Sequence, residues 1–236
     1  NGKRNAPSSA PTTTGTGPYT HVFKSGASTL PSLALELAMT DLGVYLMRDG
    51  CIVNSMEIGF DAAGTAVPSA SIGMIGKGEA KAGSSGAGTP TTYSYDPFSQ
   101  FQGTIKREGT ALGNITAGTF TFSNAAESVR TLGSGQELGG VDILLPTCSG
   151  SLTVRFDSTT LYDDAVAGTG IDLDFIYEIS ASEKLTIAVT EARLSKTPQS
   201  VSGPGGITSQ IEWRGYKATG ASQMLAITLI NDVASY

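Results

Sequence analysis

The stretch Leu33-Ala34-Leu35-Glu36-Leu37-Ala38-Met39-Thr40 alternates between large apolar residues and small or polar ones. Successive side chains of a β-strand point to opposite faces, so this period of two places the four large residues on one face. The segment is predicted to form a strand with one buried face.

The same alternation recurs along most of the chain. The apolar members of these segments are Met56, Ile58 and Phe60; Ala70, Ile72 and Met74; Phe120 and Phe122; Leu152, Val154 and Phe156; Ile171, Leu173 and Phe175; Leu185, Ile187 and Val189; Ile211 and Trp213; and Leu225, Ile227 and Leu229. Gly, Pro, Asn and Asp separate the segments, and no βαβ alternation occurs. The pattern predicts an all-β fold of antiparallel sheets closed into a sandwich or barrel, with Trp213 in the core.

The sequence divides into an arm and one domain. Residues 1–18 contain three prolines and no apolar periodicity, which predicts a flexible N-terminal arm, either simply disordered or folding onto a neighbouring subunit on assembly. Residues 19–236 are predicted to form a single β domain. Within it, residues 76–103 are rich in Gly, Ser, Thr and Pro and predict a long loop or hairpin. One short helix is expected at 124–131, capped by Asn124, and 159–166 is a second helix candidate.

Composition limits the partners that the chain can bind. The formal net charge is −6, and no basic run is longer than the two residues of Lys3-Arg4, so the sequence lacks the basic surface that binds phosphates. No apolar stretch is long enough to predict a membrane span. Cys51 and Cys148 are the only cysteines and are expected to be buried free thiols rather than a disulfide.

The sequence predicts no catalytic, cofactor-binding or metal site. His21 is the only histidine and is expected to be a hydrogen-bonded structural residue. Gly73-Met74-Ile75-Gly76-Lys77-Gly78 lacks the first Gly and the final Ser or Thr of a phosphate loop. Five acids, Asp157, Asp163, Asp164, Asp172 and Asp174, suggest a solvated strand face, with a calcium site or the negatively charged lining of an interior surface as alternatives.

Several runs together resemble the tail tube proteins of long-tailed, siphovirus-like bacteriophages. The runs occur in this order: Gly17-Pro18-Tyr19-Thr20-His21-Val22-Phe23, Leu30-Pro31-Ser32-Leu33-Ala34-Leu35-Glu36-Leu37, Gly50-Cys51-Ile52-Val53-Asn54-Ser55-Met56, Gly150-Ser151-Leu152-Thr153-Val154-Arg155-Phe156, Gly203-Pro204-Gly205-Gly206-Ile207 and Ile227-Thr228-Leu229-Ile230-Asn231-Asp232. Their order and spacing carry the resemblance, which spans most of the chain.

The resemblance implies a major tail protein that catalyses no reaction. Its copies would form a ring, by resemblance a hexamer, in which edge strands pair into one barrel around the lumen, and residues 76–103 would contact the next ring. The implied partners are the tape-measure protein, the tail terminator and baseplate or distal tail proteins, with phage DNA passing through unbound. The implied locations are the virion tail and, during assembly, the host cytoplasm.

Other functions remain open on the sequence alone. The chain could be another virion β protein, such as a tail terminator, a capsid decoration protein or an adhesin domain. A glycan hydrolase with paired carboxylates is a further alternative, although no acid pair in the sequence stands out.

Overall fold

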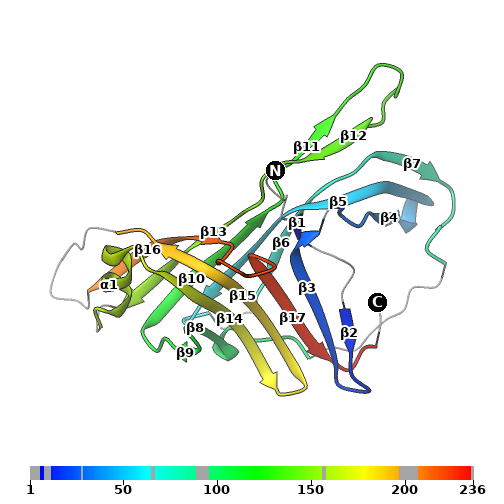
Figure 1. Ribbon diagram of the computed structural model, residues 1–236. Coiled ribbons are helices and arrows are strands. Elements are labelled where there is room, and N and C mark those ends of the chain that lie inside the picture. The colour runs from blue at the N-terminus through cyan, green and yellow to red at the C-terminus, as the bar shows by residue number, and fades with distance from the viewer. Residues whose placement is uncertain are drawn as a thin grey trace.

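The computed structural model in Figure 1 consists mainly of antiparallel strands. The structure describes residues 6–7, 12–27, 29–64, 67–88, 96–155, 158–196 and 207–234. Its main sheet has 15 strands and folds into two layers. The predicted all-β class is therefore confirmed.

The first layer has the strand order β6-β5-β10-β13-β16, and each neighbouring pair is antiparallel. Its strands are β6 (Ala70–Ile75), β5 (Val44–Asp61), β10 (Ile115–Ser123), β13 (Thr147–Arg155) and β16 (Thr208–Tyr216). The apolar alternation in these segments sets the register, because a slip by one residue would turn every buried side chain to the outside.

The second layer has the strand order β8-β14-β15-β17-β3. Its strands are β8 (Gly103–Arg107), β14 (Gly170–Ser180), β15 (Glu183–Leu194), β17 (Leu225–Asn231) and β3 (Tyr19–Ala27), with β9 (Thr110–Ala111) beside β8. Strand β15 joins the two layers, since its first half pairs with β17 and its last residues pair with β16.

The core between the layers contains a cluster of aromatic rings. Phe60 lies 5.0 Å from Phe175 and 5.2 Å from Tyr177, measured between ring centroids, and Phe175 lies 5.6 Å from Trp213. Trp213 is only 2% exposed, which confirms its predicted place in the core. Burial of each such side chain stabilises the fold by about 1.5–3 kcal/mol.

Strand β5 continues beyond the sandwich into a three-stranded arm. There it pairs with β4 (Leu33–Met39) on one side and β7 (Gly78–Ala82) on the other, and a 3-10 turn (Thr40–Leu42) links β4 to β5. Leu33, Leu35 and Leu37 are 46%, 39% and 47% exposed. The strand prediction is confirmed, but the predicted buried face is wrong for the isolated chain, because no described element covers these leucines.

The segment 76–103, predicted to be a long loop or hairpin, contains strand β7 and the 3-10 turn Gln100–Gln102. After β7 the chain bends back onto β4, where the Glu36 carboxylate accepts hydrogen bonds from Ser85 Oγ at 2.6 Å and Gly86 N at 2.7 Å. These bonds lower the pKa of Glu36, with the Ser85 hydroxyl as the largest cause. Residues 89–95 of this segment lie outside the described part.

The first helix candidate is wrong. Residues 124–131 instead contain β11 (Ala126–Val129), which forms a projecting hairpin with β12 (Gly140–Ile143) (Figure 1). Asn124 does not cap a helix, because its side chain is buried and donates to the Val53 carbonyl at 2.8 Å. Ala126 N donates to Asn54 Oδ1 at 2.7 Å, so β5 fixes the start of the hairpin.

The second candidate forms the helix, α1 (Thr160–Ala167). Gly168 ends it with a φ of 63°, a left-handed conformation that suits glycine. Leu161 is buried and packs into the hydrophobic core.

The described part of segment 1–18 contains two short strands. β1 (Ala6–Pro7) and β2 (Thr12–Thr14) both pair with β3. Residues 1–5 and 8–11, which also belong to the predicted arm, lie outside the described part.

Candidate functional site: a hydroxyl-covered sheet face

The outer face of the first layer is covered by small hydroxyl-bearing side chains. The apolar residues of its strands point into the core, so the intervening residues point outward. We call this surface the hydroxyl face; it comprises Ser71 and Gly73 of β6, Ser55, Glu57, Gly59 and Asp61 of β5, Ala117, Thr119, Thr121 and Ser123 of β10, Thr147, Ser149, Ser151, Thr153 and Arg155 of β13, and Thr208, Gln210, Glu212 and Arg214 of β16.

Strand register aligns these side chains in rows across the sheet. One row runs through Ser71, Glu57, Thr121, Ser149 and Arg214, which lie directly opposite one another on successive strands. Residues opposite each other in antiparallel strands share a face, so each row is a continuous strip of surface.

A neighbouring pair shows how the hydroxyl groups bond to one another. Thr119 Oγ1 lies 3.0 Å from Ser151 Oγ and also accepts a 2.9 Å hydrogen bond from Ser151 N. These side chains are partly exposed. The centre of the face therefore includes a pair of hydroxyl groups bonded to each other, and β10 places no long side chain there.

Charges lie on the flanking strands of the hydroxyl face. Glu57, Asp61 and Glu212 carry negative charge, and Arg155 and Arg214 carry positive charge, whereas β10 contributes no charged residue to the face. A polyanion such as DNA binds through several closely spaced Lys or Arg side chains. The hydroxyl face lacks such a set and is suited to contact without tight binding.

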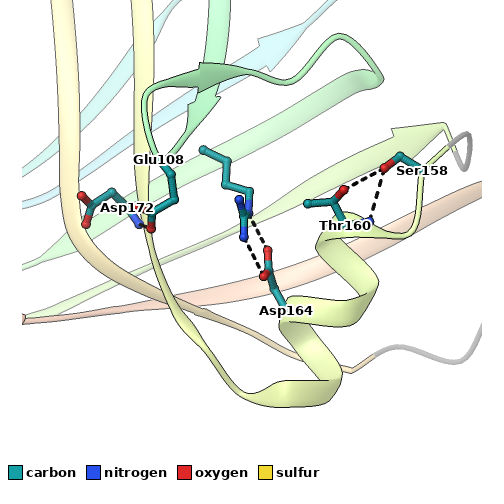
Figure 2. Close-up of polar contacts among 6 residues, drawn as sticks. Glu108, Ser158, Thr160, Asp164 and Asp172 are labelled. Carbon is teal, nitrogen blue, oxygen red and sulfur yellow. Dashed lines mark hydrogen bonds and ion pairs between the residues drawn. The ribbon is translucent and has the colours of Figure 1, made fainter.

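The predicted acidic cluster does not form one strand face. Asp163 and Asp164 lie on α1, Asp172 and Asp174 lie on β14, and Asp157 lies outside the described residues. Arg107 donates to both carboxylate oxygens of Asp164, at 2.6 and 2.8 Å. In Figure 2, Asp164 and Asp172 lie apart, and Glu108 accepts a hydrogen bond from the Asp172 backbone at 2.9 Å.

The two β14 carboxyl groups bind protons more readily than usual. Desolvation raises the pKa of Asp172, and the negative charges of Glu108 and Asp174 raise it further. Desolvation also raises the pKa of Asp174, against the opposing effect of Lys106 and Lys184. Among the described residues, no three His, Cys, Asp or Glu side chains are placed to hold a metal ion.

The remaining sequence candidates are built into the fold. His21 is fully buried; its Nε2 lies 2.8 Å from the Val233 carbonyl oxygen and its Nδ1 lies 3.0 Å from Thr13 Oγ1. Both cysteines are buried free thiols, as predicted. The glycine-rich segment 73–78 spans the end of β6 and the start of β7.

A groove lies beside the helix α1. It has a volume of about 470 Å³ and is lined by hydroxyl, amide and apolar side chains and by Arg107, whose guanidinium is bound to Asp164. Its hydroxyl groups include Ser158 and Thr160, which bond to each other at 2.9 Å (Figure 2).

The hydroxyl face was not predicted from the sequence as a functional surface. The signal was present in the polar half of the same alternation, because Thr119 and Thr121, like Ser149, Ser151 and Thr153, occupy every second position opposite the core residues. Only the register between strands, which is set by contacts distant in sequence, shows that these positions lie on one surface.

Comparison with known proteins adds an independent finding. The family whose description is phage tail tube protein matches residues 3–215 of the chain. No curated protein matches the chain. In the described part of the structure, none of the helical segments has both the length and the apolar character needed to cross a bilayer.

Proposed function

The chain belongs to the phage tail tube protein family, and we propose that its copies close into rings that stack into the tail tube, with the hydroxyl face lining the lumen. It is a structural protein of the phage tail. The tube would assemble around the tape-measure protein in the host cytoplasm and later conduct the DNA during ejection.

The hydroxyl face is the observation that carries this proposal. A conduit for DNA needs a wall that neither grips phosphates nor projects side chains into the bore. Thr119, Thr121 and Ser151 meet both requirements, since they are short, uncharged and, for Thr119 and Ser151, bonded to each other. The net charge of −6 of the whole chain adds a weak repulsion between the protein and DNA.

Unpaired strand edges support ring formation. A sheet that ends in open edges exposes backbone N–H and C=O groups, and pairing with identical neighbours satisfies these groups and closes the sheet. A hexamer is the ring size that the family resemblance suggests.

We propose that segment 76–103 contacts the next ring. Its described part includes β7 on the projecting arm, and Glu36 holds the following turn by hydrogen bonds to Ser85 and Gly86. The tube would further contact the tail terminator at one end and baseplate or distal tail proteins at the other.

Negative-stain electron microscopy of the purified protein across a concentration series tests the proposal. We expect hollow rings at low concentration and stacked tubes at high concentration. Monomers that persist at every concentration, also when the tape-measure protein is added, would contradict tube formation and favour a terminator, decoration or adhesin role.

A further inference from the structure

The first layer ends in an open strand edge on each side. Strand β6 pairs with β5 alone, so the outer edge of Ala70–Ile75 has no partner among the described strands. On the other side, β16 pairs with β15 only from Trp213 to Tyr216, and Thr208 and Gln210 have no described strand beside them there.

The backbone groups of β16 that point to this open side can be identified. The Glu212 carbonyl oxygen accepts a 2.7 Å hydrogen bond from Ser195 N, just beyond the end of β15. Backbone groups of a strand alternate sides with a period of two, so Thr208 and Gln210 point their N–H and C=O groups the same way as Glu212. These backbone N–H and C=O groups form a short strand edge that can pair with a further strand.

Strand β6 also leaves apolar surface uncovered at its own edge. Ile72 lies opposite Met56 on the core side of the layer, yet it is 51% exposed. A strand placed beside β6 would cover Ile72 with its own core-side residues. On β16 the core-side residue next to Gln210 is Ile211, which is buried, so pairing with β16 would place Ile72 next to an apolar core position.

We infer that β6 of one copy pairs with the Thr208–Gln210 edge of β16 in the next copy, an inference that rests on the proposed tube. This contact joins two different surfaces of the same chain, so it is repeated around a ring until the ring closes. It makes the hydroxyl face continuous from copy to copy, because Ser71 and Gln210 both belong to that face.

The direction of the pairing follows from the strand order. All four neighbouring pairs in β6-β5-β10-β13-β16 are antiparallel, so β6 and β16 run in the same direction. Rotation about a ring axis preserves the direction of a strand along that axis. The junction between copies is therefore a parallel ladder, whereas every junction within the layer is antiparallel.

Paired cysteines test this contact in assembled tubes. Ser71→Cys is combined in separate variants with Thr208→Cys or Gln210→Cys, the two residues of the open edge that belong to the hydroxyl face. Neighbouring strands lie about 4.8 Å apart, within disulfide range. We expect one combination to give, after mild oxidation, covalent dimers and higher multiples on a non-reducing gel. The native Cys51 and Cys148 are buried and do not interfere.

The matched control moves the first cysteine by one residue. Ile72→Cys combined with the same β16 cysteine points to the opposite face and should give no cross-link. Tubes that form from both Ser71 variants without cross-links would overturn the β6–β16 contact and leave the tube itself intact. A wild-type chain that forms neither rings nor tubes would overturn the proposed function instead.

A backbone substitution provides a second readout. Gln210→Pro removes an N–H that points away from β13, so the fold should survive, while the ladder to the next copy loses a hydrogen bond and meets the proline ring. We expect a folded chain by circular dichroism that forms no tubes, whereas Gln210→Ala assembles like the wild type. Tubes formed by Gln210→Pro at the wild-type concentration would overturn the contact.

Discussion

Arg107 on β8 donates two hydrogen bonds, at 2.6 and 2.8 Å, to the carboxylate of Asp164 on α1, 57 positions further along the chain. The side chain of Asp164 is only 10% exposed and that of Arg107 is 26% exposed. Asp164 also raises the pKa of Arg107 through this hydrogen bond. The pair fixes the helix against the second layer.

We expect Asp164→Asn to lower the free energy of unfolding by about 2 kcal/mol, because hydrogen bonds to charged groups contribute about 1.5–3 kcal/mol. Urea denaturation at neutral pH measures the loss. Asp163→Asn is the control, since Asp163 is exposed on the same helix, and its effect should stay within about 0.5 kcal/mol. Equal effects of the two substitutions would contradict an anchoring role for the pair.

Asp172→Asn should stabilise the protein at neutral pH. The pKa of Asp172 is raised in the folded chain, so ionisation of this carboxyl group destabilises the fold at pH values above both its folded and its unfolded pKa. The lost stability returns as the pH falls through the folded pKa and then the unfolded pKa. Removal of the charge should raise the free energy of unfolding by roughly 0.5 kcal/mol at pH 7. Urea titrations at pH 7 and at pH 3 check the sign, because the gain should vanish at pH 3. A gain that persists at pH 3 would show that ionisation is not its cause.

Gly150→Ala should strongly destabilise the fold. A Cβ at Gly150 would overlap the Thr119 carbonyl oxygen and would lie 2.8 Å from Trp213 Cζ2. Overpacking of this kind costs about 1–3 kcal/mol or more. Gly59→Ala is the matched control on the neighbouring part of the layer, because a Cβ there meets no atom within 4 Å. Thermal unfolding should separate the two variants by several degrees, and similar melting temperatures would contradict the close approach at Gly150.

Thr121→Lys should leave tubes intact but hinder the passage of DNA. Thr121 lies in the middle of the hydroxyl face, and a ring would repeat the new positive charge in every copy, creating a set of phosphate contacts. In a phage complementation assay, we expect normal tails by microscopy and at least a tenfold lower plaque yield. Thr219→Lys, in an exposed turn, is the control. An unchanged yield with Thr121→Lys would argue against a lumenal position of this face.

Both cysteines should resist thiol reagents until the chain unfolds. Cys148 has no exposed surface, and burial raises the pKa of its thiol to about 12, so almost no thiolate is present at pH 8. Cys51 is 2% exposed. Labelling with a chromogenic disulfide should report no reactive thiol in native buffer and two in urea. Rapid labelling of the native protein would show that the sandwich opens locally at these strands.

The strands were predictable because each carries its own alternation. A two-layer fold is enough to bury alternating pairs such as Leu152 and Val154, or Leu173 and Phe175, whatever the order of the strands. The sequence named the segment that forms α1 but could not decide between the two helix candidates, because Asn124 and its neighbours have the composition of a capped helix while Asn54, 70 positions earlier, directs them into a hairpin. The hydroxyl face depends in the same way on register between strands distant in sequence.

Strand β5 imposes a constraint on the length of the chain. Its 18 residues run as one strand from the arm into the hydroxyl face, but Gly50, with a φ of 60°, and a register shift against β6 between Val53 and Ser55 lie between the two regions. In a regular extended stretch, one added residue exchanges the two faces of everything that follows, whereas an irregular position can absorb it as a bulge. Evolution of this strand can therefore change residues freely at exposed positions, but single insertions or deletions are tolerated only near Gly50 and Val53, between the arm and the sheet.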